Sequence, residues 1–167
     1  RFEHSIGTYF LAGKVVDSLN KNSDPSIIQK HLEEIPELKD HYKKSEQQLI
    51  DPHIRELIKI AALCHDIGHG PFSHVLENTL VSGISHEEIS LRLMQQMNSE
   101  MDGKLTLAIR IFQDQYPKHF LHQLISSQLD MDRMDYLRRD SFFTGVSEGV
   151  IGYDRIIKML TVKDDQL

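Results

Sequence analysis

Apolar positions recur with helical spacing through most of the chain. Between residues 2 and 19 they form a stripe that predicts a helix. Its members are Phe2, Ile6, Tyr9, Phe10, Leu11, Val15, Val16 and Leu19. A second apolar stripe predicts a helix over residues 54–66, which ends on the adjacent pair His65 and Asp66.

The same spacing predicts shorter helices further along the chain, over residues 72–80, 86–98, 105–114, 119–127 and 132–143. Ser85 followed by Glu88 is the capping-box pattern, so we expect the 86–98 helix to begin there. Glycines between residues 145 and 152 mark a loop, and residues 155–162 fit either a helix or a strand. We therefore predict an all-α helical bundle, with a β-strand at its C-terminal end as the alternative.

One segment departs from this pattern. Residues 20–52 are polar and broken by prolines at 25, 36 and 52, so we interpret them as an insertion that includes a short helix over 26–34. Residues 1–167 otherwise predict a single domain. The chain opens without Met on a helical pattern, and residues 163–166 resemble a hairpin turn. We therefore expect an internal fragment of a longer protein.

Composition excludes several classes of protein. The net charge of −6 argues against a general nucleic-acid binder and against binding to anionic membranes. No apolar run approaches the length of a membrane span. The single cysteine, Cys64, excludes an internal disulfide and is typical of a reducing compartment, so we expect a cytoplasmic protein.

The most distinctive stretch is residues 61–74, where a helical pattern breaks at glycines and restarts. It contains His65, Asp66, His69 and His74, and imidazole with carboxylate suits a divalent transition metal. A lone His–Asp pair is also typical of a buried histidine with its partner. Candidate ligands elsewhere in the sequence help to distinguish these two interpretations.

Candidate ligands occur on separate predicted helices, which is how helical bundles build metal sites. His4 lies on the first helix, His65 and Asp66 end another, and Asp130 or Asp132 begins a later one. Two imidazoles and two carboxylates form a mixed set typical of Fe, Mn, Ni, Co or Zn. Spacing alone does not choose between the two later aspartates.

The 132–143 helix carries Asp132, Tyr136 and Asp140 on one face, which spans about 12 Å. Such a face suits a groove that has a metal at one end and binds hydroxyl groups at the other, although a solvated face is the alternative. His74 and Glu77 lie one turn apart, so the carboxylate could orient the imidazole. That pairing makes His74 the preferred general acid.

Four stretches carry a family resemblance: residues 1–7, 63–74, 85–87 and 128–140. Together they resemble the HD-domain phosphohydrolases. Within that family, the stretch 128–140 is similar to the branch of deoxynucleoside triphosphate triphosphohydrolases, which includes the SAM-and-HD-domain protein.

The resemblance implies an all-α fold and a role for each matching residue. The implied metal ligands are His4, His65, Asp66 and Asp132. The implied substrate contacts are Arg1 and Arg133 on phosphate, and Tyr136 and Asp140 on the sugar 3′-hydroxyl. The implied catalytic groups are His74 as proton donor, Glu77 as its support, and His69 and His86 near the α-phosphate.

We accordingly expect an enzyme that converts a dNTP to deoxynucleoside and tripolyphosphate, with Mg²⁺ on the substrate phosphates. The preference for deoxynucleotides is implied by the branch alone. The alternatives are an HD nucleotidase or phosphodiesterase with another nucleotide substrate, and a non-catalytic nucleotide-sensing module. A homo-oligomer is compatible with the resemblance.

Overall fold

The structure is a computed structural model that describes residues 1–22, 50–72, 74–75 and 83–167. Most of the polar segment 20–52, with its expected helix over 26–34, lies outside the described residues. So does most of the helix expected over 72–80, of which residues 74 and 75 are helical.

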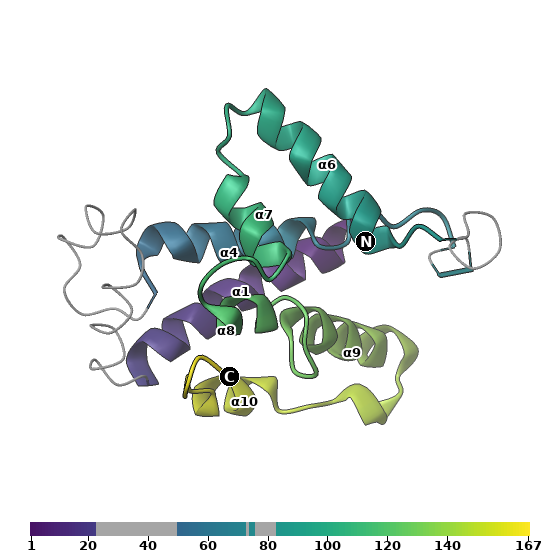
Figure 1. Cartoon of the computed structure of the whole chain (residues 1–167). Coiled ribbons are helices and arrows are strands. Elements are labelled where there is room, and N and C mark those ends of the chain that lie inside the picture. The colour runs from purple at the N-terminus through teal and green to yellow at the C-terminus, as the bar shows by residue number, and fades with distance from the viewer. Residues whose placement is uncertain (23–49, 73, 76–82) are drawn as a thin grey trace.

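The described part of the chain is built from helices, as predicted (Figure 1). They are α1 (Phe2–Asn22), α4 (Pro52–Cys64), α6 (His86–Glu100), α7 (Thr106–Phe112), α8 (His119–Gln123), α9 (Met131–Thr144), the 3₁₀ turn η2 (Ser147–Gly149) and α10 (Tyr153–Met159). None of them is long and apolar enough to cross a membrane.

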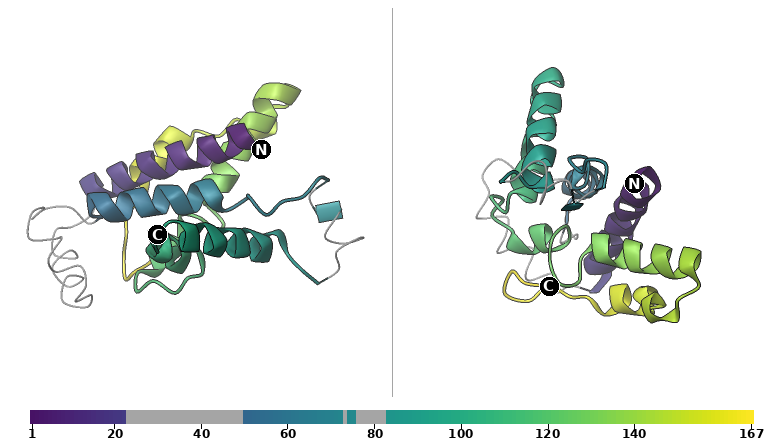
Figure 2. Two further views of the ribbon diagram at one scale, coloured as in Figure 1. Left: turned by 90° about the horizontal axis from the view of Figure 1, so that it is seen from above. Right: turned by 90° about the vertical axis from the view of Figure 1, so that its right-hand side faces the viewer.

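Helix α1 runs antiparallel to α4, and the two lie side by side (Figure 2). Near the start of α1, the Thr8 hydroxyl donates to the Ala62 carbonyl oxygen at 3.0 Å. At the other end of α1, Asn20 exchanges hydrogen bonds with the Ile50 backbone. The facing side chains are almost fully buried: Leu11, Val15, Val16 and Leu19 from α1, and Ile54, Leu57, Ile58 and Ala61 from α4.

The C-terminal helices cover another side of α1. Helix α9 contacts the first turns of α1, and α10 lies along its later turns, where the Ser18 hydroxyl donates to the Ile157 carbonyl oxygen at 2.9 Å. Helix α1 therefore lies between α4 and the α9–α10 pair (Figure 2). This arrangement brings the start of α1, the end of α4 and the start of α9 together.

Part of the predicted apolar stripe of α1 lies outside this core. Phe2 is 78% exposed and Phe10 is 58% exposed, and Ile6 between them is also exposed. Residues 2, 6 and 10 are spaced by four, so they form a second apolar face next to the one that packs on α4. Periodicity predicted the helix correctly, but it did not separate the face that packs on α4 from the exposed face of residues 2, 6 and 10.

Helix boundaries follow the expected capping chemistry. The Ser85 side chain accepts from the Glu88 backbone at 3.1 Å, as predicted. Glu88 instead pairs with Arg92 at 2.7 Å, so only half of the capping box forms. Gly145 ends α9 with φ +73°, a left-handed conformation that glycine adopts without strain.

The alternative of a C-terminal strand is not supported. Residues 153–159 form α10, and the described chain ends in a single antiparallel bridge between Lys163 and Gln166. Asp164 and Asp165 between them have φ of 50° and 59°, the geometry of a tight hairpin turn. The expected turn is therefore present, whereas the segment before it is helical.

Gly68 holds α6 against the turn that follows α4. Its backbone N–H donates to the Ser90 hydroxyl at 2.9 Å, and that hydroxyl donates to the His65 carbonyl oxygen at 2.8 Å. A Cβ at residue 68 would overlap the backbone of His86 and Ser90. Only glycine allows this close approach.

We expect Gly68→Ala to lower the free energy of unfolding by about 1–3 kcal/mol, because the backbone of α6 must move away from the turn. Urea unfolding of the metal-free protein measures the change. Gly152→Ala is the matched control, since nothing lies within 4 Å of a Cβ there, and it should stay within about 0.5 kcal/mol of wild type. An equal effect in both variants would contradict the packing argument.

Candidate metal centre

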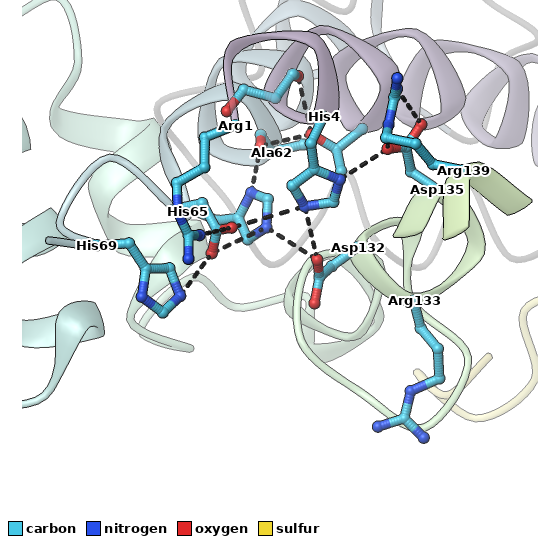
Figure 3. Close-up of polar contacts among 12 residues, drawn as sticks. Arg1, His4, Ala62, His65, His69, Asp132, Arg133, Asp135 and Arg139 are labelled. Atoms are coloured by element: carbon cyan, nitrogen blue, oxygen red, sulfur yellow. Dashed lines mark hydrogen bonds and ion pairs between the residues drawn. The ribbon is translucent and has the colours of Figure 1, made fainter. Parts of the chain in front are cut away.

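Four predicted ligands converge from three elements, and Figure 3 labels three of them, His4, His65 and Asp132. His4 comes from α1, His65 and Asp66 directly follow α4, and Asp132 lies in the first turn of α9. One nitrogen or oxygen from each lies within 4.8 Å of the others. His4 Nε2 lies 2.8 Å from Asp132 Oδ1 and 3.6 Å from Asp66 Oδ2.

The His65 ring shows that this group suits a cation. Its Nδ1 donates to the Ala62 carbonyl oxygen at 2.6 Å, so in the neutral ring Nε2 is the nitrogen with the lone pair. Among the described residues, that buried Nε2 has no hydrogen-bond partner and lies 3.4 Å from both Asp66 and Asp132. Because buried polar atoms are nearly always satisfied, a lone pair directed at two carboxylates fits a divalent metal ion.

The structure distinguishes the two aspartates that spacing left open. Asp130 is the N-cap of α9, and its carboxylate accepts from the backbone N–H groups of Arg133 at 2.7 Å and Ser127 at 2.8 Å. Asp132 lies two residues later and points at both imidazoles. Asp130 therefore positions the helix that presents Asp132.

Electrostatics ties His4 to its carboxylates. Hydrogen bonds to Asp132 and Asp135 raise the pKa of His4 to about 9, although its burial acts in the opposite direction. Burial opposes the charged forms of Asp132 and Asp135, but contacts with positively charged partners outweigh it and lower both pKa values. These partners are His4 and His65 for Asp132, and His4 and Arg139 for Asp135. Burial also opposes the charged form of His65, but Asp132 and Asp66 outweigh it and raise its pKa.

Three further histidines lie beside this group. The rings of His69 and His86 are stacked with centroids 3.7 Å apart, and the exposed His74 lies 5.3 Å from the first and 5.4 Å from the second. His69 Nε2 lies 3.4 Å from Asp66 Oδ1. Burial is the largest cause that lowers the pKa of His69 to about 4, and the neighbouring His86, Arg1 and His74 add to it against the attraction of Asp66, so this imidazole is neutral at neutral pH.

The remaining predicted residues are more scattered. Arg1 Nη1 lies 3.1 Å from Asp66 Oδ2, whereas the Arg133 side chain extends away from the cluster (Figure 3). Tyr136 is half-buried and Asp140 is exposed, further along α9 from the ligands. Glu77, expected to support His74, lies outside the described residues.

Sequence reasoning gave no role to Asp135 or Gly7, and it did not pair Arg139 with Asp135. Asp135 contacts His4 on the side opposite the other ligands, and Arg139 contacts Asp135. The i,i+4 spacing of Asp135 and Arg139 was the signal available in the sequence. The spacing did not reveal that the pair faces α1.

A family model described as the HD domain matches residues 1–140 of this chain. The chain belongs to the HD domain family. This match covers the elements that supply all four candidate ligands. It stops before the turn η2 and helix α10.

Several relatives of this HD domain extend well beyond it. YwfO of Bacillus subtilis is 34% identical over the whole chain, which covers 34% of that protein. A protein of Dictyostelium discoideum named as a deoxynucleoside triphosphate triphosphohydrolase SAMHD1 homolog is 30% identical over the whole chain, which covers 31% of it. The chain thus spans about a third of the length of these relatives.

A solved structure gives the same fold. The phosphohydrolase BT4208 of Bacteroides thetaiotaomicron is 53% identical, with a TM-score of 0.79. That match covers 99% of this chain and 35% of the other. The region of that relative that matches this chain is therefore about a third of its length.

We expect the metal-free domain to lose stability as the pH rises from about 6.5 through about 9. The pKa of His4 is raised in the folded state, so its proton stabilises the fold fully below the unfolded pKa near 6.5 and no longer above about 9. Urea midpoints at pH 6, 8 and 10 in the presence of chelator measure this loss. His4→Asn should remove this part of the pH dependence, and a wild-type midpoint that stays constant or rises would contradict the assignment.

Proposed function

We propose that this HD domain is the catalytic part of a metal-dependent phosphohydrolase, which converts a dNTP to deoxynucleoside and tripolyphosphate. The observation that carries the proposal is the convergence of two imidazoles and two carboxylates, with the buried Nε2 of His65 lacking a hydrogen-bond partner among the described residues. Such a donor set suits Fe, Mn, Ni, Co or Zn.

The names of two similar proteins support the reaction class. One relative is named as a deoxynucleoside triphosphate triphosphohydrolase homolog, and one solved neighbour as a phosphohydrolase. Each is about three times as long as this chain, so activity and substrate choice belong to the whole protein. The assays below therefore use the full-length protein.

His4, His65, Asp66 and Asp132 would hold the metal ion. When bound, a divalent ion supplies Lewis acidity toward a phosphoryl oxygen and lowers the pKa of a coordinated water. Mg²⁺ on the polyphosphate would offset part of its charge.

Phosphate binding is assigned to arginine. The Arg1 side chain is 45% exposed and its guanidinium lies beside Asp66, so it can contact a phosphate next to the ligand group. Arg133 begins in the same turn of α9 as Asp132, and we assign it to phosphate as well. Its outward orientation means that it must turn toward the substrate to make this contact.

Proton transfer is assigned to the histidine cluster. The nucleophilic water loses a proton to solvent and forms a bond to the α-phosphorus, and the bond from that phosphorus to the sugar 5′-oxygen breaks. His74 donates a proton to the departing 5′-oxygen, and the exposed position of its ring permits contact with substrate. Neutral His69, stacked on His86, can donate a hydrogen bond to the α-phosphate.

The arrangement of α9 supports attack at the α-phosphorus rather than the γ-phosphorus. Tyr136 and Asp140 follow Asp132 by one and two turns, a rise of about 6 Å and about 12 Å. A sugar bound by these side chains would lie close to the ligand group. The α-phosphate is the phosphate nearest to the sugar, so it would lie nearest to the metal.

Product analysis tests the proposal directly. We expect the full-length protein with Mn²⁺ or Fe²⁺ to release deoxynucleoside and tripolyphosphate from a dNTP, and hydrolysis in ¹⁸O-water to label only the tripolyphosphate. His65→Ala should abolish both metal content and turnover while keeping the helical circular dichroism spectrum. The panel includes NTPs and cyclic nucleotides.

Other outcomes of this panel would contradict the proposal. Release of monophosphate with pyrophosphate would indicate cleavage between the α- and β-phosphates. Turnover of cyclic nucleotides alone would indicate a phosphodiesterase. Tight nucleotide binding by the metal-loaded protein without turnover would indicate a sensing module.

Sugar recognition gives a separate prediction. We expect Tyr136→Phe and Asp140→Ala to lower kcat/KM about 10-fold for a nucleotide with a 3′-hydroxyl, because each removes a hydrogen bond worth about 1 kcal/mol or more. The 3′-deoxy analogue should be affected much less. Equal losses for the two nucleotides would exclude these side chains from sugar recognition.

A further inference from the structure

Asp135 is a carboxylate that neither the ligand set nor the proposed reaction uses. It lies in α9, one turn after Asp132, and is only 9% exposed. Its Oδ2 lies 2.7 Å from His4 Nδ1, the ring nitrogen opposite the one that faces the other ligands. Burying a carboxylate without partners costs free energy, so Asp135 needs further partners besides His4.

Arg139 holds this carboxylate from the next turn of α9. The guanidinium donates from Nε to Asp135 Oδ2 at 3.0 Å and from Nη2 to Oδ1 at 3.0 Å, a bidentate pair with a defined orientation. The same Nη2 donates to the Glu3 carbonyl oxygen of α1 at 3.0 Å. Arg139 thus fixes Asp135 relative to both helices.

Gly7 makes room for the pair. It lies one turn after His4 on α1, and a Cβ at that position would overlap the Asp135 carboxylate and the Arg139 guanidinium. A larger residue would push the carboxylate away from the imidazole. Three residues outside the ligand set are therefore arranged around one hydrogen bond to His4.

That hydrogen bond decides which nitrogen of His4 is available. An acceptor at Nδ1 requires a proton there, so in the neutral ring Nε2 carries the lone pair and points at the ligand group. His65 has the same arrangement, with the Ala62 carbonyl oxygen as acceptor for Nδ1. The acceptor for His4 differs in being a carboxylate, which also makes the imidazole a stronger electron donor.

We infer that Asp135, oriented by Arg139 and accommodated by Gly7, is a positioning residue that fixes the ring orientation and tautomer of His4 for metal binding. The inference rests on the metal site of the proposed function. It assigns Asp135 no contact with metal or substrate. Its effect passes entirely through His4.

Titration of the full-length protein with Co²⁺, in competition with a chromophoric chelator, tests the inference without an activity assay. We expect Asp135→Ala to raise the Kd for Co²⁺ about 10–100-fold and to change the visible spectrum of the bound ion, because the His4 ring is no longer held. Asp135→Asn should lose less, since its amide oxygen can still accept from Nδ1. Arg139→Gln, which keeps the carboxylate but loosens it, should weaken binding in the same direction.

Asp17→Asn is the matched control. Arg55 also binds Asp17 in a bidentate pair, at 2.8 and 3.0 Å, and that pair joins α4 to α1 away from the ligand group. This control should lose some stability but keep the wild-type Co²⁺ affinity and spectrum. If Asp135→Ala does not fold, the Co²⁺ affinities and spectra of Asp135→Asn and Arg139→Gln test the positioning role instead.

The outcomes separate this inference from the proposed function. Wild-type affinity and spectrum in the Asp135 and Arg139 variants would overturn the positioning role alone. Failure of the wild-type protein to bind Co²⁺ would overturn both the positioning role and the metal site. Metal binding that depends on Asp135, without hydrolysis of any triphosphate, would support the positioning role and overturn the proposed function.

Discussion

The arrangement of the site depends on one imidazole whose two nitrogens both contact carboxylates. His4 Nδ1 faces Asp135 at 2.7 Å and Nε2 faces Asp132 at 2.8 Å, so α1 and α9 meet at this ring. One turn later on α1, Thr8 donates to the Ala62 carbonyl oxygen, which also accepts from His65. On α1, His4 therefore contacts α9, and Thr8, one turn later, contacts α4.

The charges in the centre explain how it stays assembled before any metal binds. With a pKa of about 9, His4 is protonated at neutral pH and offsets the repulsion among the surrounding carboxylates. A divalent ion needs the neutral imidazole, so binding would exchange a proton for a metal ion of higher charge. The ligands thus lie close together in advance, and binding would require little rearrangement.

Sequence periodicity predicted the helices well, because burial against α4 imposes a helical repeat on α1. It could not separate the core face of α1 from the exposed face that includes Phe10, since both repeat every four residues. Spacing could not choose between Asp130 and Asp132, because capping and metal binding both use a carboxylate near a helix start. The family resemblance implied Asp132, and the structure shows Asp130 at the N-cap. Asp135 was missed since its partner, His4, lies 131 positions away in the sequence.

The geometry of the site supports a divalent metal ion bound between α1, the end of α4 and α9. Anomalous diffraction at the metal absorption edge, from crystals of the full-length protein grown with Mn²⁺ or Co²⁺, tests it most directly. We expect a peak within metal–ligand bonding distance of Nε2 of His4, Nε2 of His65 and carboxylate oxygens of Asp66 and Asp132. A peak elsewhere, or none at this position under saturating metal, would contradict it.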